Sequence, residues 1–319
     1  MSVPSSARPS WIGLGLWLVL LTAIISGVST FVNAYAVQGT NSDAFVTARN
    51  LATTLLLVPI ALLGSRTVRA RLRGVDWARL AVIGLIGGAI PFLLFFRGIE
   101  LAAAAGGAAT ASFAYRTLFL FATVFGIVFL RERFHWRVTA AAVLLLGGNL
   151  LLLSLVAPIW TDGTAYVFAA TVLWAAEYTL SRRVLRDLPS PTVALGRMGF
   201  GAMFLVAYLG ATAQLGAIGS LSGGQWQWVA ISAILLTAFV TTWYAGLRRV
   251  EVGVATSVLV LGFPVTWLLD VLIARSPFTV GEVAGAVIVA AGVGVAIGRS
   301  LLRDAWRSVA RGGTPRPET

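Results

Sequence analysis

The chain has 319 residues, 58% of them hydrophobic and only 11% charged, whereas a soluble domain has roughly 25% charged residues. Its net charge of +12 comes from arginines placed mostly in short gaps between apolar runs, a pattern typical of a membrane topology signal and not of a nucleic-acid-binding surface. With no cysteine and one histidine, His135, the sequence excludes disulfides, thiolate metal sites and histidine-based clusters.

Ten apolar runs follow a short polar N-terminal tail, and each has about the 20 residues that a helix needs to cross a bilayer. The first run lacks a small-residue cleavage site, so we expect a retained helix and not a signal peptide. The fourth run is long for one crossing and is expected to be tilted or bent. The predicted spans are Ile12–Tyr35, Ala44–Leu63, Trp77–Phe96, Ala102–Leu130, Val138–Val156, Ala165–Arg182, Val193–Ala213, Trp226–Leu247, Val254–Ala274 and Val280–Gly298.

The arginines indicate the orientation of these spans. If the N-terminus is cytoplasmic and the spans alternate, 19 arginines fall in cytoplasmic segments and two in outside loops. This is a strong positive-inside pattern. We therefore predict a multi-pass protein of the cell (inner) membrane with both termini in the cytoplasm. The basic C-terminal stretch is expected to be a short amphipathic segment on the inner membrane face, followed by disorder.

The two halves of the chain are related to each other. A shift of 148 residues places Arg49 on Arg197 and Gly98 on Gly246, and a shift of 144 aligns the later spans. Each half has five spans, an odd number, so the second half enters the membrane from the opposite side. The predicted fold is an all-α integral membrane protein of ten transmembrane helices in two inverted five-helix repeats. The predicted divisions are a cytoplasmic tail (1–11), repeat 1 (12–156), repeat 2 (157–299) and a basic cytoplasmic tail (300–319).

Glu177 is the candidate functional residue that the sequence marks most clearly. A carboxylate at membrane depth costs roughly 2.5–3.5 kcal/mol on insertion scales, so it needs a partner or water. Helical spacing places it on one face with Trp174, Tyr178 and Ser181. The 148-residue shift maps this face onto polar residues of the first span: Ser26, Ser29, Thr30 and Asn33. We expect both faces to line a shared cavity, with Glu177 as a substrate or proton site; the alternative is a structural ion pair with Arg116.

Arg116, in the fourth span, is predicted either to bind a substrate carboxylate through paired hydrogen bonds or to form a buried ion pair. Glu177 and Asp270 are the acids nearest to it in expected depth. For Asp270 a role in an outer vestibule or at a helix end is as plausible as one at the midplane. Five aromatic residues are candidates for stacking on a cargo, with ordinary packing as the alternative for each: Tyr115, Trp174, Tyr178, Tyr244 and Trp267.

Two further sets of residues are expected to be structural. Arg49 and Arg197 are predicted to reach the headgroups or helix ends. Glycines in the fifth and last spans indicate tight helix contact, within one chain or between two copies. These are Gly147, Gly148, Gly281, Gly285 and Gly292.

Several motifs occur in an order that resembles a known family. An arginine lies early in the second span of each half, in AFVTARNLATTLLLVP and TVALGRMGFGAMFLV; LRERF closes the fourth span before TAAAVLLLGGNLLLL; and the sixth span contains VLWAAEYTLSRRVL. Together they resemble the EamA-type members of the drug/metabolite transporter superfamily over residues 12–298. The family usually has a proline in the middle of the fourth span. Pro264 matches it in the second half, but Leu120 stands there in the first.

The resemblance implies a secondary transporter or exporter of small amphipathic metabolites, such as amino acids, working by alternating access. Sugar or nucleotide cargo on the same fold, and a membrane-embedded lipid-modifying enzyme, are the alternatives. No Walker motif is present and the chain has no lysine, which excludes ATP hydrolysis by this chain. We expect no cofactor or metal, proton coupling as an open possibility, and a small-molecule substrate and the bilayer as partners. A monomer and a homodimer are both left open.

Overall fold

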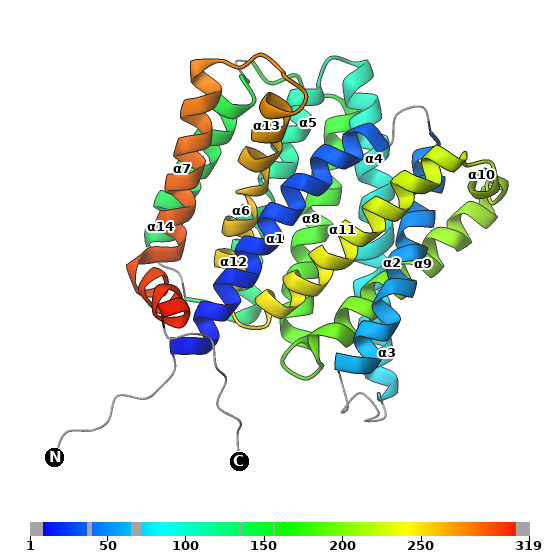
Figure 1. Ribbon diagram of the computed structural model, residues 1–319, viewed down its shortest axis with the longest axis horizontal. Coiled ribbons are helices and arrows are strands. Elements are labelled where there is room, and N and C mark those ends of the chain that lie inside the picture. The colour runs from blue at the N-terminus through cyan, green and yellow to red at the C-terminus, as the bar shows by residue number, and fades with distance from the viewer. Residues whose placement is uncertain (1–8, 37–39, 65–71, 134–135, 156, 311–319) are drawn as a thin grey trace.

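The computed structural model describes residues 9–36, 40–64, 72–133, 136–155 and 157–310, and the elements of this part of the chain are all helices (Figure 1). Eight helical segments are long and apolar enough to cross a membrane. α7 is apolar but shorter, and α8 is long enough but carries more polar residues. Together these make the ten predicted spans, and the predicted fold class is confirmed.

The first repeat begins with two long helices. Its third span is one continuous helix with a π-helical segment in the middle, and its fourth span is divided into two helices. The elements are α1 (Pro9–Ala36), α2 (Ser42–Gly64), α3 (Gly74–Ile83), the π-helix η1 (Gly84–Ala89), α4 (Ile90–Ala104), α5 (Ala108–Arg116), α6 (Leu118–Leu130) and α7 (Trp136–Leu152).

The second repeat follows the same plan, with one short extra helix between its second and third spans. Its fourth span is again divided in two. The elements are α8 (Asp162–Val184), α9 (Ser190–Ala211), α10 (Gly216–Gly219), α11 (Gly223–Leu247), α12 (Val252–Leu259), α13 (Gly262–Leu272) and α14 (Val280–Ala310).

The fourth span of each repeat is broken at matching positions. In the first repeat the break lies at Thr117, whose hydroxyl donates a hydrogen bond of 2.6 Å to the Ala114 carbonyl. In the second repeat it lies between α12 and α13, and the 144-residue shift maps Thr117 onto Leu261 there. The span predicted at 102–130 starts too early, because residues 102–104 still belong to α4. Gly106, with a φ of +72°, makes the turn that follows.

The two repeats interlock through exchanged contacts. The third span of each repeat packs on the first span of the other, α4 against α8 and α11 against α1. A Cβ added to Gly98 would lie 2.8 Å from the carbonyl oxygen of Gly163, and one added to Gly246 would lie 3.2 Å from that of Gly15. The 148-residue shift maps the first pair onto the second. These two equivalent contacts reflect the internal repeat in three dimensions. The helices approach so closely at both that only glycine fits there.

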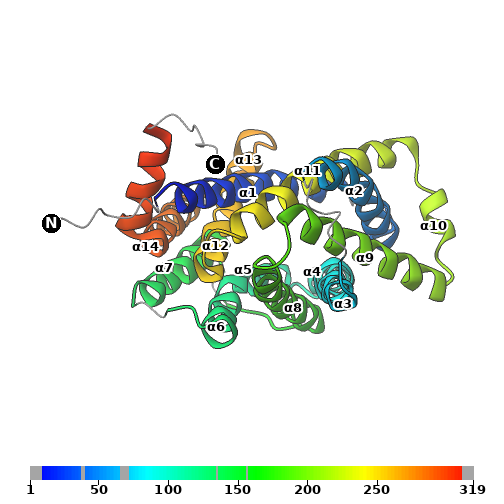
Figure 2. The same ribbon diagram turned by 90° about the horizontal axis from the view of Figure 1, so that it is seen from below.

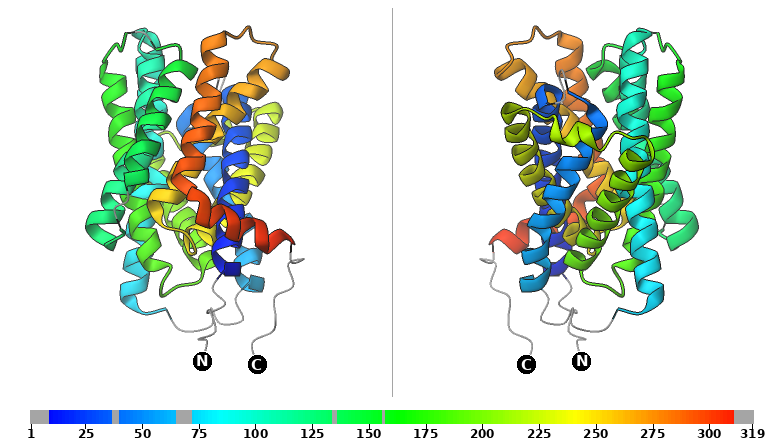
Figure 3. Two further views of the ribbon diagram at one scale, coloured as in Figure 1. Left: turned by 90° about the vertical axis from the view of Figure 1, so that its left-hand side faces the viewer. Right: turned by 90° about the vertical axis from the view of Figure 1, so that its right-hand side faces the viewer.

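The glycines of the fifth and last spans make a close contact within one chain. α7 and α14 lie side by side (Figure 3), and a Cβ on Gly148 would lie 2.9 Å from the carbonyl oxygen of Gly285. Gly292 also faces α7, whereas Gly147 and Gly281 have more space around them. The predicted tight contact therefore joins two helices of the same molecule.

The last helix turns sharply at the end of its membrane span. Gly298 interrupts α14 with φ 73° and ψ 160°, a conformation that essentially only glycine adopts. The helix then continues to Ala310 at an angle to the span, as Figure 3 shows. This agrees with a separate helical segment after residue 298. The predicted disorder beyond it, most of the N-terminal tail and His135 lie outside the described residues.

Candidate functional site

The carboxyl group of Glu177 lies in the interior of the bundle, between α8, α9 and α11. The residue is fully buried, with 0% of its surface exposed. Its Oε1 atom accepts hydrogen bonds from the hydroxyl of Ser181 at 2.5 Å and from that of Tyr244 at 2.7 Å. Its Oε2 atom lies 3.5 Å from Nε of Arg197, which is itself buried. One cation and two hydroxyl donors thus offset the cost of burying this charge.

The π-helix η1 brings a backbone carbonyl to the same place. The carbonyl oxygen of Gly87 accepts a hydrogen bond of 2.9 Å from Nη2 of Arg197 and one of 3.0 Å from the indole N–H of Trp174. A Cβ on Gly87 would lie 2.8 Å from Cδ of Glu177 and 3.0 Å from Nε of Arg197. π-Helical segments are rare in proteins, and those that occur lie frequently at functional sites. The position of η1 beside Glu177 is therefore informative. Gly87 is the residue that lets η1 approach the ion pair.

Aromatic rings connect this buried group with the centre of the molecule. The ring centroid of Trp174 lies 5.4 Å from those of Phe92 and Phe95 and 5.5 Å from that of Tyr115. Tyr115 in turn makes an edge contact of 5.8 Å with Phe263 of the other repeat. These T-shaped and tilted arrangements are the ones that aromatic quadrupoles favour. The aromatic cluster therefore joins α4, α8 and both broken spans.

A small cavity lies beside the two breaks. Its volume is about 20 Å³, room for about one water molecule. α1 contributes Ser26 and Thr30 to its lining, α5 contributes Tyr115 and Arg116, and α13 contributes Phe263. The cavity thus brings together residues from both repeats at their discontinuous helices.

Arg116 is the charged residue of this cavity. Its Nη1 donates a hydrogen bond of 2.9 Å to Oδ1 of Asn149, and its guanidinium carbon lies 4.3 Å from the centre of the Phe263 ring. Its Nε is buried and has no hydrogen-bond partner among the described residues. No carboxylate of the described chain forms an ion pair with it, so the alternative that paired it with Glu177 or Asp270 is wrong. Arg197 holds Glu177 instead.

The polar face of α1 does not share one cavity with Glu177 in this conformation. Asn33 accepts a hydrogen bond of 2.6 Å from Ser232 of α11 and donates one of 3.3 Å to Ser29, so these residues fasten α1 to α11. Ser26 and Thr30 line the small cavity, but Glu177 does not. The expected shared cavity is therefore not formed in this conformation, in which Glu177 is fully buried and its Oε1 accepts hydrogen bonds from Ser181 and Tyr244.

The remaining predicted residues lie around this centre in different ways. Tyr178 is buried against the ring of Trp243 with centroids 4.6 Å apart. Trp267 donates an indole hydrogen bond of 3.2 Å to Glu282 of α14, and it does not line the cavity. Asp270 is partly exposed near the end of α13. The structure thus groups Trp174 and Tyr244 with Glu177, and Tyr115 with Arg116, but leaves Trp267 and Asp270 apart.

The matched arginines of the two second spans are both buried, at 3% exposure each, so neither reaches the headgroups. The guanidinium carbon of Arg49 lies 4.9 Å from the centre of the Phe92 ring, and that of Arg197 lies 6.0 Å from the same centre. Arg197 has an acid, but the residue that the repeat places opposite Arg49 is Ser29, which is no acid. The two halves are therefore symmetric in backbone and asymmetric in charge.

Sequence reasoning missed four members of this site: Arg197 as the partner of Glu177, Gly87, Asn149 and Phe263. A signal existed for Arg197, because a buried acid and an arginine in adjacent spans each need a partner. Phe263 had a weaker signal as the repeat partner of Phe119. Nothing in the local sequence distinguishes Gly87 from the glycine beside it. In the described part of the chain, His, Asp and Glu side chains form no group of three that could hold a metal ion.

Comparison with known proteins points to one family. The model of the EamA-like transporter family matches residues 13–154 and again residues 162–298. Among 28 matching chains of solved structures, one described only as a protein crystal structure has a TM-score of 0.71 at 19% identity, covering 91% of this chain and 99% of its own. At that identity the likeness concerns the fold. No curated protein matches the chain.

Proposed function

Because the chain belongs to the EamA-like transporter family, we propose that it is a secondary exporter of small amphipathic metabolites that carry a carboxylate, such as amino acids and related compounds. Membership sets the chain among multi-pass membrane transporters and not among enzymes. The cargo class, the direction of transport and the coupling are our proposal. Its main support is the position of Arg116 at the junction of the two repeats.

Arg116 has the properties of a carboxylate-binding residue. It ends α5 at the break of the fourth span, and the break in α12 and α13 lies across the same cavity. In transporters built from inverted repeats, discontinuous helices at the midplane form the substrate site. Its Nε is buried without a partner, so an arriving carboxylate would satisfy it through paired hydrogen bonds. The adjacent rings of Tyr115 and Phe263 would contact the apolar part of the cargo.

Transport requires this cavity to enlarge. A volume of about 20 Å³ cannot hold an amino acid, so the helices around the cavity must separate during the cycle. The exchanged packing of α4 on α8 and of α11 on α1 makes rocking of one repeat against the other the simplest movement. The broken spans would then open the cavity alternately toward the two sides.

Glu177 is proposed as the proton-coupling group. It does not line the cavity, but contacts through Trp174 and Tyr115 connect its surroundings with the cavity wall. Protonation would remove the attraction to Arg197 and leave the hydroxyl contacts. Since the charged and neutral forms favour different partners, proton binding would shift the balance between two arrangements of the bundle.

The proposed orientation places both termini in the cytoplasm. It rests on the distribution of arginines along the sequence, 19 on one side and two on the other. With this orientation the loop that contains Glu132 and the end of α8 face the cytoplasm. Labelling of single cysteines introduced at Arg133 and at Arg275 in intact cells would test it, since the chain has no cysteine of its own.

The cargo can be tested with the purified full-length protein in proteoliposomes. A thermal-shift screen of amino acids, sugars and nucleotides would select compounds, which are then measured by counterflow. We expect carboxylate-bearing amphipathic compounds to be transported, and Arg116→Gln to raise KM by about tenfold or more, the loss of one bidentate charged contact. The matched control is Arg97→Gln, which removes an exposed arginine of α4 that lies outside the cavity.

Two outcomes would contradict this assignment. Transport by Arg116→Gln with unchanged KM would remove the arginine from cargo recognition. Selection of neutral sugars over all carboxylates would favour the alternative cargo class on the same fold. For the coupling, uptake is compared with and without a pH gradient in the unaltered protein and in Glu177→Gln, with Glu100→Gln as the exposed control. An unchanged response of Glu177→Gln would exclude Glu177 as the coupling group.

A further inference from the structure

A second, larger cavity of about 600 Å³ opens where α3 begins and where α6 and α8 end. Figure 2 shows α6, α8 and α3 in a row along one side of the bundle, so this cavity lies on the outer wall, where α3 and α6 of the first repeat meet α8 of the second. None of the residues around Arg116 lines it. It is therefore separate from the proposed cargo site.

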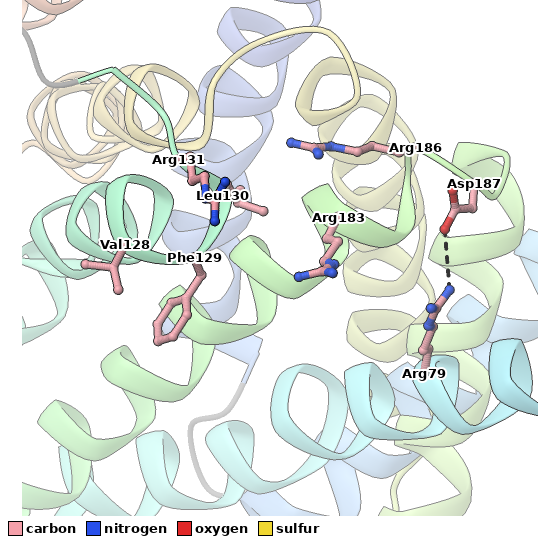
Figure 4. A pocket seen from close by; sticks show the side chains of 8 residues that line it. All are labelled: Arg79, Val128, Phe129, Leu130, Arg131, Arg183, Arg186 and Asp187. Carbon is pink, nitrogen blue, oxygen red and sulfur yellow. Dashed lines mark hydrogen bonds and ion pairs between the residues drawn. The ribbon is translucent and has the colours of Figure 1, made fainter.

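Arginines dominate the lining of this outer cavity. Arg79 comes from α3, Arg131 from the end of α6, Arg183 from the last turn of α8 and Arg186 from the turn that follows α8 (Figure 4). Asp187 is the acid among the lining residues, and it pairs with Arg79 at 3.4 Å. The other three arginines form no hydrogen bond or ion pair with the side chains that the structure describes. Three like charges that converge in a recess attract an anion.

Arg131 is held in this recess by an unusual backbone. It ends α6 in the left-handed conformation, with a φ of 57°, a position at which helices usually have glycine. The cost of that conformation is tolerated more readily where the side chain has a role. Figure 4 shows Arg183 and Arg186 extending from α8 toward the side on which Arg131 lies. The three guanidinium groups thus face one volume from two helices.

One wall of the outer cavity is apolar and faces outward. Val128 and Phe129 line it next to Leu130, and 62% and 63% of the first two residues are exposed. They belong to the membrane-spanning segment Ala108–Leu130, so in the bilayer they face lipid. A soluble anion would gain nothing from this wall, whereas an acyl chain would pack along it.

We propose that the outer cavity binds an anionic phospholipid, with its phosphate among Arg131, Arg183 and Arg186 and its acyl chains along the exposed face of α6. Planar guanidinium groups match phosphate oxygens in pairs, and basic recesses between transmembrane helices are suited to lipid headgroups. Three arginines without acids favour a headgroup with two phosphates over one with a single phosphate. The assignment depends on insertion in the membrane and not on the identity of the cargo.

Native mass spectrometry of the full-length protein released from detergent tests this proposal. The probes are diphosphatidylglycerol, phosphatidylglycerol and phosphatidylcholine at equal concentration. We expect the two anionic lipids to be retained and the zwitterionic one to be lost. In the triple variant Arg131→Gln, Arg183→Gln, Arg186→Gln, the amount of diphosphatidylglycerol retained should fall by about tenfold or more, because each basic residue near the headgroup contributes to binding.

The matched control is the triple variant Arg133→Gln, Arg137→Gln, Arg248→Gln, which removes the same charge from exposed positions outside the cavity. Equal lipid loss in both triple variants, or in neither, would overturn the assignment. Displacement of the lipid by excess inorganic phosphate would also overturn it and show a site for the free anion.

A measurement on the unaltered protein covers the case in which the triple variant does not fold. A photoactivatable analogue of phosphatidylglycerol is crosslinked in nanodiscs, and the labelled peptides are identified. We expect labels on Val128 to Arg131 and on Arg183, Arg186 and Asp187, which line the cavity. Labels confined to other helices would exclude this site whatever the behaviour of the variants.

Discussion

Glu177 of α8 and Arg197 of α9 form an ion pair of 3.5 Å in which neither side chain is more than 3% exposed. The two residues come from the first and second spans of the same repeat, and the π-helix of the other repeat closes over them through Gly87. The pair therefore depends on both repeats. A movement of one repeat against the other would change the surroundings of a buried acid, which is what proton coupling requires.

The ion pair predicts a strong dependence of stability on both partners. Arg197→Met should lower the free energy of unfolding by about 3–5 kcal/mol, because it leaves a buried carboxylate without its cation. Glu177→Gln should also destabilise the protein, and the double variant should be less unstable than the sum of the two. Unfolding in mixed micelles measures all three. Additive effects would contradict a direct coupling between the two residues.

Gly87 should not tolerate a side chain. In Gly87→Ala the new Cβ would lie 2.8 Å from Cδ of Glu177, and we expect a loss of about 1–3 kcal/mol together with a loss of transport. Gly147→Ala is the control, because a Cβ there meets no atom within 4 Å and alanine suits a helix interior better. If both variants behaved alike in thermal unfolding and in uptake, the close approach of η1 would not matter.

Glu132 should make the stability of the protein depend on pH. Its carboxylate accepts hydrogen bonds of 2.8 Å from the N–H of Val252 and 3.4 Å from that of Gly253, at the start of α12 in the other repeat. Burial raises the pKa of Glu132 above its usual value of 4.5; nearby Glu251 adds to this, whereas the two N–H donors and Arg182 oppose it. A raised pKa means that the folded protein binds this proton more tightly than the unfolded chain.

The sign of the effect follows from that shift. The stabilising contribution of Glu132 to folding is complete below pH 4.5, which is the pKa of this group in the unfolded chain. It is lost as the pH rises through the higher pKa of the folded state. The melting temperature should therefore fall over this range in the unaltered protein and fall less in Glu132→Gln. Glu100→Gln, an exposed glutamate that does not contribute to the pKa of Glu132, serves as the control. An identical pH profile for Glu132→Gln would contradict the prediction.

The turn at Gly298 should tolerate only glycine. With φ 73° and ψ 160°, Gly298→Ala would force a strained backbone at a cost of about 1–3 kcal/mol, or the helix would straighten. Gly294→Ala, one turn earlier and in open space, should be neutral or slightly stabilising. Thermal unfolding and protease access to the segment after residue 298 distinguish these cases. Equal results for the two alanine variants would exclude a conformational requirement at Gly298.

Much of the fold could be predicted from local features of the chain. Apolar length gave the span positions to within a few residues in most cases, and the matching of Gly98 with Gly246 indicated the internal repeat, whose exchanged helix contacts the structure then showed. The fourth span was the exception, because a tilt or bend was expected there but neither the break nor its position was predicted. Hydropathy does not locate the break at Thr117, because the whole segment is long and apolar enough to be one span and no proline marks the position.

The candidate site could be predicted only in part. The cost of an acid or a guanidinium in the membrane singles out Glu177 and Arg116 without any structure. Their partners could not be predicted, since a residue's depth follows from its place in the span but its neighbours depend on how the helices are rotated. The structure joined Glu177 to Arg197 and left Arg116 with Asn149 and an aromatic ring.

By itself the sequence determined that the chain spans the membrane ten times, that its halves are inverted copies and that charges buried in it need partners. The spans and the need for partners follow from solvation, because lipid penalises every polar group that is not satisfied along the chain. The inverted halves follow from the 148-residue match and the odd number of spans in each half. Only the tertiary structure decided which charges meet, where both fourth spans break and that arginines converge on the outer wall. Such contacts join residues far apart in the chain, and apolar helices can pack in many ways that local sequence does not distinguish.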